Sequence, residues 1–428
     1  MIRAIYSLLV TVAAPAAFAI VLLRGFRDRA YWEHPGERFG WGPRTPAPAL
    51  WLHAVSLGEV AAATELVRAL RTRHPDVPFV LTTSTPTGRA RARALFGADV
   101  DVRFLPYDTP GAVGRFLDRI RPRVAIILET ELWPNLVRGC VRRGIPVVFA
   151  SARLTARSVA RYRRLGRLFG DTVAAGELIA AQSPQDAERF IAVGADPGRT
   201  RVVGNVKFDL RLDDSVRERG RELRRSYLGS RPVWVAGSTH AGEEEQVLVA
   251  HAELRVAMPD LLLVLVPRHP QRFHAVAALL TRRGVRFERR SGDRPVRPEA
   301  EVLLVDSVGE LTALYAAADA AFVGGSLVPV GGHNLLEPAV LGVPVITGPH
   351  TGHAADIARP LIARGGAVEV GDSGALAEAL RRLLQDPAAR VQAVHAAREF
   401  VDAHRGAVGR LTDLIDRLIA RSNRAASP

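Results

Sequence analysis

From residue 50 onward, short runs of apolar and β-branched residues alternate with longer stretches in which apolar residues recur every three or four positions. Such continuous apolar runs are typical of strands buried on both faces, and the longer stretches predict amphipathic helices. In the first half, strands are predicted over residues 50–54, 79–83, 102–105, 124–129, 147–150 and 178–182. The pattern restarts after Gly220, with strands over residues 233–237, 261–266, 285–288, 302–305, 321–324 and 343–347.

This double alternation predicts an α/β chain with two Rossmann-like domains, residues 30–215 and 230–420, that face a cleft. The stretch between them, residues 208–232, is charged and poor in strand-forming residues. Ligands of open parallel sheets bind where the carboxyl ends of the strands run into helices. Candidate site residues are therefore sought at those strand ends.

The N-terminus carries a separate signal. Residues 4–23 form 20 positions without a charge, which is about the length of a helix that crosses the ~30 Å core of a bilayer. Ala17-Phe18-Ala19 resembles a signal-peptide cleavage site. However, the apolar run is long for a signal peptide, and Arg24, Arg27 and Arg29 follow at once. Because basic residues keep the adjacent side in the cytoplasm, we expect residues 1–24 to be an uncleaved membrane anchor with a cytoplasmic body.

The charge distribution narrows the choice of partners. The net charge of +14 lies entirely in the first 230 residues, while residues 231–428 carry equal numbers of acidic and basic groups. This asymmetry indicates an anionic partner for the first domain. Without interleaved aromatic residues or a nucleic-acid motif, a non-catalytic binder of anionic polymers such as DNA is the weaker alternative. The single cysteine, Cys140, excludes an internal disulfide and a cysteine-rich metal site.

The first predicted strand runs into the segment HAVSLGE, which ends at Glu59. Ser56 and Glu59 have the spacing of a helix capping box, but a carboxylate at a strand end could also act as a general base. Spacing alone leaves both interpretations open. The hydroxyl-rich segment TTSTPTGR, which ends at Arg89, follows the next strand. It could hold an oxyanion, and a simple helix cap is slightly favoured.

Two further polar sets follow in the first half. Glu129 and Glu131 come directly after a buried strand and lie beside Trp133, which suits a sugar site better than a metal site without histidines. Lys207, within GNVKFD, is the only lysine in the chain. A compact ammonium suits a phosphate or a developing anion, and an ion pair with Asp209 or another neighbour is the alternative.

In the second half, the segment STHAGEEE suits either anion binding or helix capping. Arg268-His269, held between prolines at a strand end, predicts a phosphate clamp. Residues 324–338 contain two Gly-Gly pairs before a helix, which predicts backbone N–H groups that approach a ligand closely. This loop matches neither a dinucleotide nor a Walker motif, so a nucleotide-sugar site is favoured, in which the loop amides bind the phosphate and Glu337 binds the ribose hydroxyls.

The ordered motifs WLHAVSLGEV, TTSTPTGR, ETELWPN, SARLTARS, GNVKFD, STHAGEEE, PRHPQRF and GGSLVPVGGHNLLEP together resemble those of the 3-deoxy-D-manno-octulosonic acid (Kdo) transferases. The resemblance runs from the N-terminal segment to about residue 370. It implies a GT-B fold, inversion at the anomeric carbon, CMP-Kdo as donor, a lipid A precursor (lipid IVA) as acceptor, and no cofactor or metal. It also implies that the membrane of the anchor is the inner membrane. A GT-B enzyme that uses a UDP-sugar or CMP-sialic acid is the alternative.

The resemblance also implies residue roles. Glu59 matches a proton acceptor, and Glu129 and Lys207 match residues that stabilise the transition state. The implied CMP-binding residues are Arg268, His269, Gly309, Glu310, Leu311, Asn334, Leu335, Leu336 and Glu337.

Overall fold

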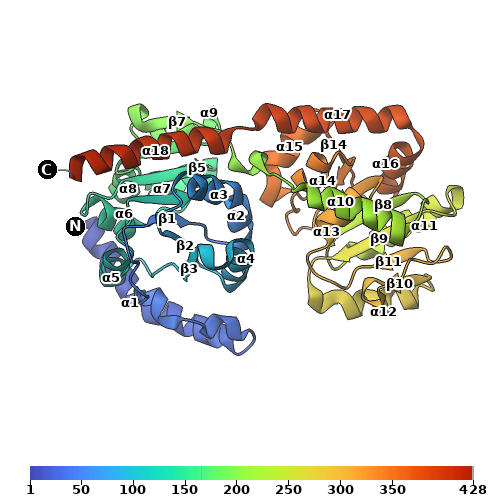
Figure 1. The fold of residues 1–428 in the computed structure, drawn as a ribbon, viewed down its shortest axis with the longest axis horizontal. Helices are drawn as coiled ribbons and strands as arrows, with labels where there is room; N and C mark the ends of the chain where they lie inside the picture. The colour runs from blue at the N-terminus through green and yellow to red at the C-terminus, as the bar shows by residue number, and fades with distance from the viewer. Residues whose placement is uncertain (165, 427–428) are drawn as a thin grey trace. The chain divides into compact units, whose positions relative to one another are not determined.

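The computed structural model describes residues 1–164 and 166–426, with side-chain surroundings up to residue 421. Its described part divides into two compact units, each built on a parallel sheet (Figure 1). Unit 1 contains Met1–Asp209 and the C-terminal segment from His404, and unit 2 contains Leu210–Ala403.

The sheet of unit 1 has seven strands in the order β3-β2-β1-β4-β5-β6-β7, and every neighbouring pair is parallel. The six predicted strands are confirmed within one or two residues at each end, and the short edge strand β7 was not predicted. The strands are β1 (Leu50–His53), β2 (Phe79–Thr83), β3 (Asp101–Phe104), β4 (Val124–Leu128), β5 (Val147–Ala152), β6 (Leu178–Ala181) and β7 (Thr200–Val202).

Helices pack on both faces of this sheet, which is why its middle strand, β4, is apolar at every position. Three of the helices, α4, α5 and α9, begin with a Thr or Ser N-cap followed by proline, which suits the first helical turn. The helices of unit 1 are α1 (Ile2–Gly25), α2 (Leu57–Ala62), α3 (Thr64–Arg73), α4 (Pro86–Phe96), α5 (Pro110–Ile120), α6 (Pro134–Val141), α7 (Ala156–Arg164), α8 (Arg167–Ala174), α9 (Pro184–Ala192) and α18 (Ala407–Ala426).

Unit 2 repeats the architecture with the strand order β10-β11-β9-β8-β12-β13-β14, again all parallel. The six strands predicted for this half are also confirmed, and the edge strand β14 was not predicted. The strands are β8 (Val233–Thr239), β9 (Leu262–Pro267), β10 (Phe287–Arg289), β11 (Val302–Leu304), β12 (Ala320–Val323), β13 (Val345–Thr347) and β14 (Ala367–Glu369). The helices are α10 (Asp214–Leu223), α11 (Glu244–Ala257), α12 (Phe273–Arg282), α13 (Leu311–Ala316), α14 (Leu336–Leu341), α15 (Ala355–Ala363), α16 (Ser373–Gln385) and α17 (Pro387–His404).

The C-terminal helix departs from the expected domain boundary. A second domain that ends at residue 420 would include most of α18, but this helix belongs to unit 1 (Figure 1). Its apolar stripe, which includes Leu411, Ile415 and Ile419, is buried in the core between β1, β4 and α3. The Asp209 carboxylate also accepts hydrogen bonds from Gly406 N (2.5 Å) and Val408 N (2.6 Å) and so caps the start of α18.

The predicted N-terminal helix is present as α1. Among the described residues it is the one helix whose length and composition suit a membrane span, with a mean hydropathy of 2.2 in its most apolar window.

Candidate active site

Glu59 lies at the carboxyl end of β1, in the first turn of α2. Its Oε2 atom accepts a hydrogen bond of 2.8 Å from Val55 N, while its own N–H donates to Ser56 Oγ at 3.5 Å. The serine half of the predicted capping box is therefore present, whereas the Glu59 side chain bonds the residue before the N-cap. In the described part of the chain, Oε1 of Glu59 receives no hydrogen bond, so one oxygen fixes the side chain and the other is left to accept a proton.

Glu129 and Lys207 form an ion pair, with Glu129 Oε1 2.9 Å from Lys207 Nζ. Glu129 directly follows β4 and has a left-handed backbone, with φ of +56°. A non-glycine residue in this conformation costs roughly 1–2 kcal/mol, and such strain is concentrated at functional sites. Both side chains remain partly exposed, at 22% for Lys207 and 18% for Glu129, so the pair is accessible to a ligand.

The Glu59 carboxyl group interacts electrostatically with the Glu129–Lys207 pair. The pKa of Glu59 is raised to about 7, mainly by burial and also by the carboxylates of Glu129 and Glu131. The Val55 N–H and the Lys207 ammonium lower it. Glu59 therefore shares one electrostatic environment with the Glu129–Lys207 pair, and its pKa is close to the value that suits a general base at neutral pH.

Two residues that we did not single out from the sequence support this site. Ser151, at the carboxyl end of β5, has φ of +49° and is almost fully buried. Its Oγ atom accepts hydrogen bonds from Gln182 Nε2 (3.2 Å), which follows β6, and from Val206 N (3.4 Å), directly before Lys207. Ser151 thus ties two strand ends to the segment that carries the lysine. The sequence signal was a pair of polar residues, Ser151 and Gln182, at successive strand ends.

The TTSTPTGR segment forms a cap rather than an anion site. Thr85 Oγ1 accepts a hydrogen bond from Gly88 N at 3.1 Å and so caps α4. Arg89, which we considered for an oxyanion, is buried and paired with Glu37 through contacts of 2.7 and 3.1 Å. Its guanidinium is therefore already neutralised within the core of unit 1.

In unit 2, the glycine-rich loop after β12 differs from the prediction. Both carboxylate oxygens of the buried Glu243 accept hydrogen bonds from backbone N–H groups of this loop, at Gly325 (2.7 Å), Ser326 (3.0 Å) and Leu327 (2.9 Å). Gly331 and Gly332 donate instead to the carbonyl of Gly325. These amides are occupied by the protein itself, so the prediction that they hold a phosphate was wrong. The anion in this nest is the Glu243 side chain.

A cluster of cationic and imidazole side chains lies beside the loop. Arg268 and His269 follow β9 as predicted, and the His240 ring after β8 lies 5.3 Å from that of His269. His240 also stacks on His333, with a Nε2–Nε2 distance of 2.8 Å. One Nε2 atom of that pair must accept the hydrogen bond, so the two imidazoles are not both protonated. Burial, Arg268 and neighbouring histidines lower the pKa of His333 to about 3, so Arg268 supplies a permanent positive charge beside neutral rings.

Glu310, the central residue of the Gly309-Glu310-Leu311 turn, has internal partners. Its carboxylate accepts hydrogen bonds from Ser307 Oγ and from Arg290 at 2.9 Å. Gly309 has φ of +92°, and nothing lies within 4 Å of the position of an added Cβ, so the backbone of this turn is open.

The polar side chains of the segment from Asn334 to Glu337 also have hydrogen-bond partners within the protein. Asn334 Nδ2 donates to Glu337 Oε1 at 3.2 Å, and Thr312 Oγ1 donates to Glu337 Oε2 at 3.3 Å. Leu335 and Leu336 are buried core residues and offer a ligand only their backbone.

Comparison with known proteins identifies the family. Residues 33–210 match the family model described as 3-Deoxy-D-manno-octulosonic-acid transferase (kdotransferase), and residues 239–400 match Glycosyl transferases group 1. The 3-deoxy-D-manno-octulosonic acid transferase of Haemophilus influenzae is 39% identical to this chain, over 98% of the chain and 99% of the relative. The chain belongs to the Kdo transferase family. The enzyme of the same name from Bordetella pertussis is also 39% identical, over 97% of the chain and 99% of the relative.

A more distant solved structure agrees on the fold. The UDP-GlcNAc 2-epimerase from Neisseria meningitidis has a TM-score of 0.58 with 12% identity, and the match covers 88% of this chain and all of the epimerase. This likeness concerns only the fold, and it agrees with the two Rossmann-like units of a GT-B-type Kdo transferase.

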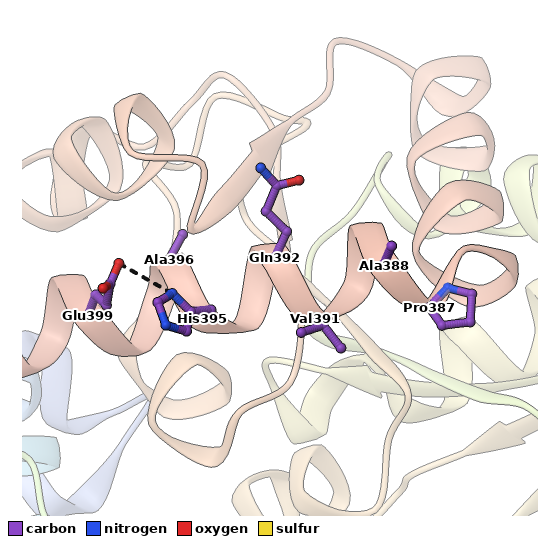
Figure 2. Close-up of a pocket in the computed structure, with 7 residues that line it drawn as sticks. All are labelled: Pro387, Ala388, Val391, Gln392, His395, Ala396 and Glu399. Atoms are coloured by element: carbon purple, nitrogen blue, oxygen red, sulfur yellow. Dashed lines mark ion pairs between the residues drawn. The ribbon is translucent and has the colours of Figure 1, made fainter.

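One pocket of this Kdo transferase is lined by none of the predicted site residues. Figure 2 shows a pocket along one face of α17, lined by Val391, Gln392, His395 and their helical neighbours, with an exposed ion pair of 3.3 Å between His395 and Glu399. Among the residues that the structure describes, no group of three or more His, Cys, Asp or Glu side chains is arranged to hold a metal ion.

Proposed function

We propose that this Kdo transferase moves Kdo from CMP-Kdo to a hydroxyl of a lipid A precursor (lipid IVA), with inversion, in lipopolysaccharide core synthesis. The observation that carries the proposal is the arrangement in unit 1: Glu59, with a pKa of about 7, shares its environment with the Glu129–Lys207 ion pair. Membership of the family indicates that the transferred sugar is Kdo. The site provides a base, Glu59, and a cation, Lys207, at the edge of the sheet.

The reaction needs one proton acceptor. A hydroxyl oxygen of the acceptor attacks the anomeric carbon of Kdo while its proton passes to the unbonded Oε1 of Glu59. The bond from the anomeric carbon to the phosphate oxygen breaks, and its electron pair leaves with CMP. A carboxylate whose pKa lies near 7 is unprotonated in about half of the molecules at neutral pH and releases the proton readily afterwards.

The developing charges also need partners. The transition state of such a transfer resembles an oxocarbenium ion at the sugar, while negative charge grows on the departing phosphate. Lys207, held by Glu129, would stabilise negative charge on the donor, such as its carboxylate or phosphate, and Glu129 would balance the cationic sugar. Arg268 and His269 would bind the CMP phosphate in place of the loop amides that Glu243 occupies.

The remaining binding roles follow from chemistry and charge. Glu337, oriented by Asn334 and Thr312, would accept hydrogen bonds from the ribose hydroxyls. The positive charge of the first 230 residues would attract a phosphorylated lipid at the cytoplasmic face of an anionic inner membrane. We further propose that the reaction needs neither a metal nor a cofactor.

Donor competition tests the proposal. Purified protein in detergent is given CMP-Kdo and lipid IVA, with CMP or UDP added as inhibitor, and the anomeric configuration of the product is read by NMR. The proposal expects inhibition by CMP at much lower concentration than by UDP, an inverted product, and full activity after treatment with EDTA. Stronger inhibition by UDP, or retained configuration, would contradict the donor or the mechanism.

A further inference from the structure

Helix α1 has two different faces. One stripe along the whole helix is at least partly shielded from solvent, and its residues recur at a spacing of three or four positions. The stripe consists of residues 3, 6, 7, 10, 14, 17, 18, 21 and 25. The opposite face is apolar and exposed, with exposed fractions of 64% for Leu8, 63% for Leu9, 70% for Val12 and 65% for Leu23. The helix therefore packs against protein on one side and leaves large aliphatic side chains uncovered on the other.

The shielded stripe is joined to the globular body by polar contacts. Tyr6 Oη donates to Asp108 Oδ2 at 2.9 Å, and Ser7 Oγ donates to Asn135 Oδ1 at 2.8 Å. Near the start of the helix, an Arg3 nitrogen lies 3.5 Å from an oxygen of Asp171 in α8. Asp108 and Asn135 are themselves buried, so these contacts fix the helix to the folded unit.

An apolar contact continues the attachment along the helix. The Phe18 ring packs edge-on against Phe39, with 5.0 Å between the ring centres. At 1.5 Å per residue, the attached portion from Arg3 to Phe18 is about 22 Å long. A helix that crossed the ~30 Å hydrocarbon core would therefore carry Asp108, Asn135 and Asp171 into the lipid with it. The exposed carboxylate of Asp171 and the loop that carries Asp108 are not compatible with that position.

The exposed side matches a lipid surface instead. The last turn of α1 contains Arg24, and the helix is followed by Arg27 and Arg29 and by two exposed aromatic residues, Phe26 and Trp32. Trp32 Nε1 donates to the carbonyl of Leu22 at 2.9 Å, which holds this aromatic pair against the helix. An apolar helical face with arginines and aromatic residues at its end is typical of helices that lie in the interface of an anionic bilayer.

We propose that α1 lies in the plane of the membrane, with its exposed face among the acyl chains of one anionic leaflet, and does not cross the bilayer. This inference deepens the proposed function. Asn135 follows Glu129 and Glu131 by only a few residues, so the lipid surface lies beside the strand end that carries the reactive groups. A lipid-borne acceptor then reaches Glu59 without leaving the leaflet.

Sided labelling tests the topology in the full-length protein. Cys140 is replaced by serine, and a short tag with one cysteine is placed before Met1. Inverted inner-membrane vesicles and spheroplasts are then exposed to a membrane-impermeant maleimide, with Val256→Cys, at an exposed site of unit 2, as the reporter for the catalytic side. The proposal expects the tag and Val256→Cys to be labelled in the same preparation. Labelling of the two in opposite preparations would overturn it.

A depth measurement provides an independent check. Spin labels at positions 5, 9, 12 and 23 of protein reconstituted in phosphatidylglycerol-rich vesicles should all report one shallow depth. A maximum depth at position 12, with shallow values at both ends, would show a spanning helix.

Vesicle affinity tests the contact itself. The double variant Leu8→Gln/Leu9→Gln should lower partitioning into these vesicles at least tenfold, while Val391→Gln, at an exposed helical position of unit 2, should not change it. Equal partitioning of all three proteins would overturn the proposal. None of these readouts requires turnover, so they are distinguishable from a failure of the proposed reaction.

Discussion

Replacement of Glu59 by glutamine should separate its two structural roles. A glutamine oxygen can still accept the hydrogen bond from Val55 N, so the start of α2 is retained. The neutral amide cannot accept a proton from the sugar hydroxyl. General-base catalysis contributes roughly 10²- to 10⁴-fold to a rate, so we expect kcat to fall by at least about 100-fold while the protein stays folded.

The stability of the same variant should change in the opposite direction. The folded protein raises the pKa of Glu59 from 4.5 to about 7, which corresponds to an upper limit of about 3–4 kcal/mol at roughly 1.4 kcal/mol per pKa unit. Partial exposure of the side chain reduces this figure. Because the folded-state pKa is raised, the stabilisation is complete below pH 4.5 and is lost as the pH rises through about 7. Glutamine does not ionise, so Glu59→Gln should be more stable than the wild type at pH 8, by about 1–2 kcal/mol.

The assay combines a pH–rate profile with urea denaturation at pH 5 and pH 8. Wild-type kcat/KM should rise through pH 7 as Glu59 loses its proton, and the variant should lack this limb. If Glu59→Gln kept more than half of the activity, or if it were less stable than the wild type at pH 8, Glu59 would be a helix cap and not the base.

Three other substitutions have distinct expected outcomes. Lys207→Arg keeps the charge but not the compact shape, so kcat should fall at least tenfold. The control Arg201→Lys, at an exposed position, should leave kcat unchanged. If Lys207→Arg were as active as the wild type, the ion pair of Lys207 with Glu129 would be purely structural. Glu243→Gln places an amide NH₂ against loop N–H groups and should lower the free energy of unfolding of unit 2 by roughly 2–4 kcal/mol. The control Glu253→Gln, at an exposed position of α11, should change the free energy of unfolding by no more than about 0.5 kcal/mol in the same denaturation assay. An equal change in the two variants would contradict the stabilising role of the hydrogen bonds between Glu243 and the loop. Arg268→Met should weaken CMP binding roughly 10- to 100-fold by calorimetry, and unchanged affinity would remove Arg268 from the donor site.

Most of the sheet architecture could be predicted because its strands are buried on both faces. An unbroken run such as Val124–Leu128 therefore identifies its strand without tertiary information. The edge strands Thr200–Val202 and Ala367–Glu369 were missed because each has only three residues and is partly exposed. The position of α18 was missed for another reason: an amphipathic stripe shows that a helix packs on a sheet, but not on which of two similar sheets.

Some features of the candidate site could likewise be identified from the sequence, and others could not. Glu59 and Glu129 could be singled out because each follows a predicted strand, and Lys207 because it is the only lysine in the chain, while their roles came from the resemblance. The partner of Arg89 was not, because Glu37 lies 52 positions away and no local pattern links them. The glycine loop misled us because glycines suggest an open backbone, whereas the acceptor of their N–H groups, Glu243, comes from a helix start about 80 residues earlier in the chain.

The central claim, transfer of Kdo from CMP-Kdo to a lipid A precursor, is tested most directly by the mass of the product. Purified protein is incubated with lipid IVA and CMP-Kdo, and the lipid fraction is analysed by mass spectrometry beside a Glu59→Gln control. The account predicts a lipid heavier by one or more whole Kdo residues, with a matching release of CMP, and almost none of either with the variant. An unmodified lipid in the presence of intact enzyme, or equal product from the variant, would contradict it.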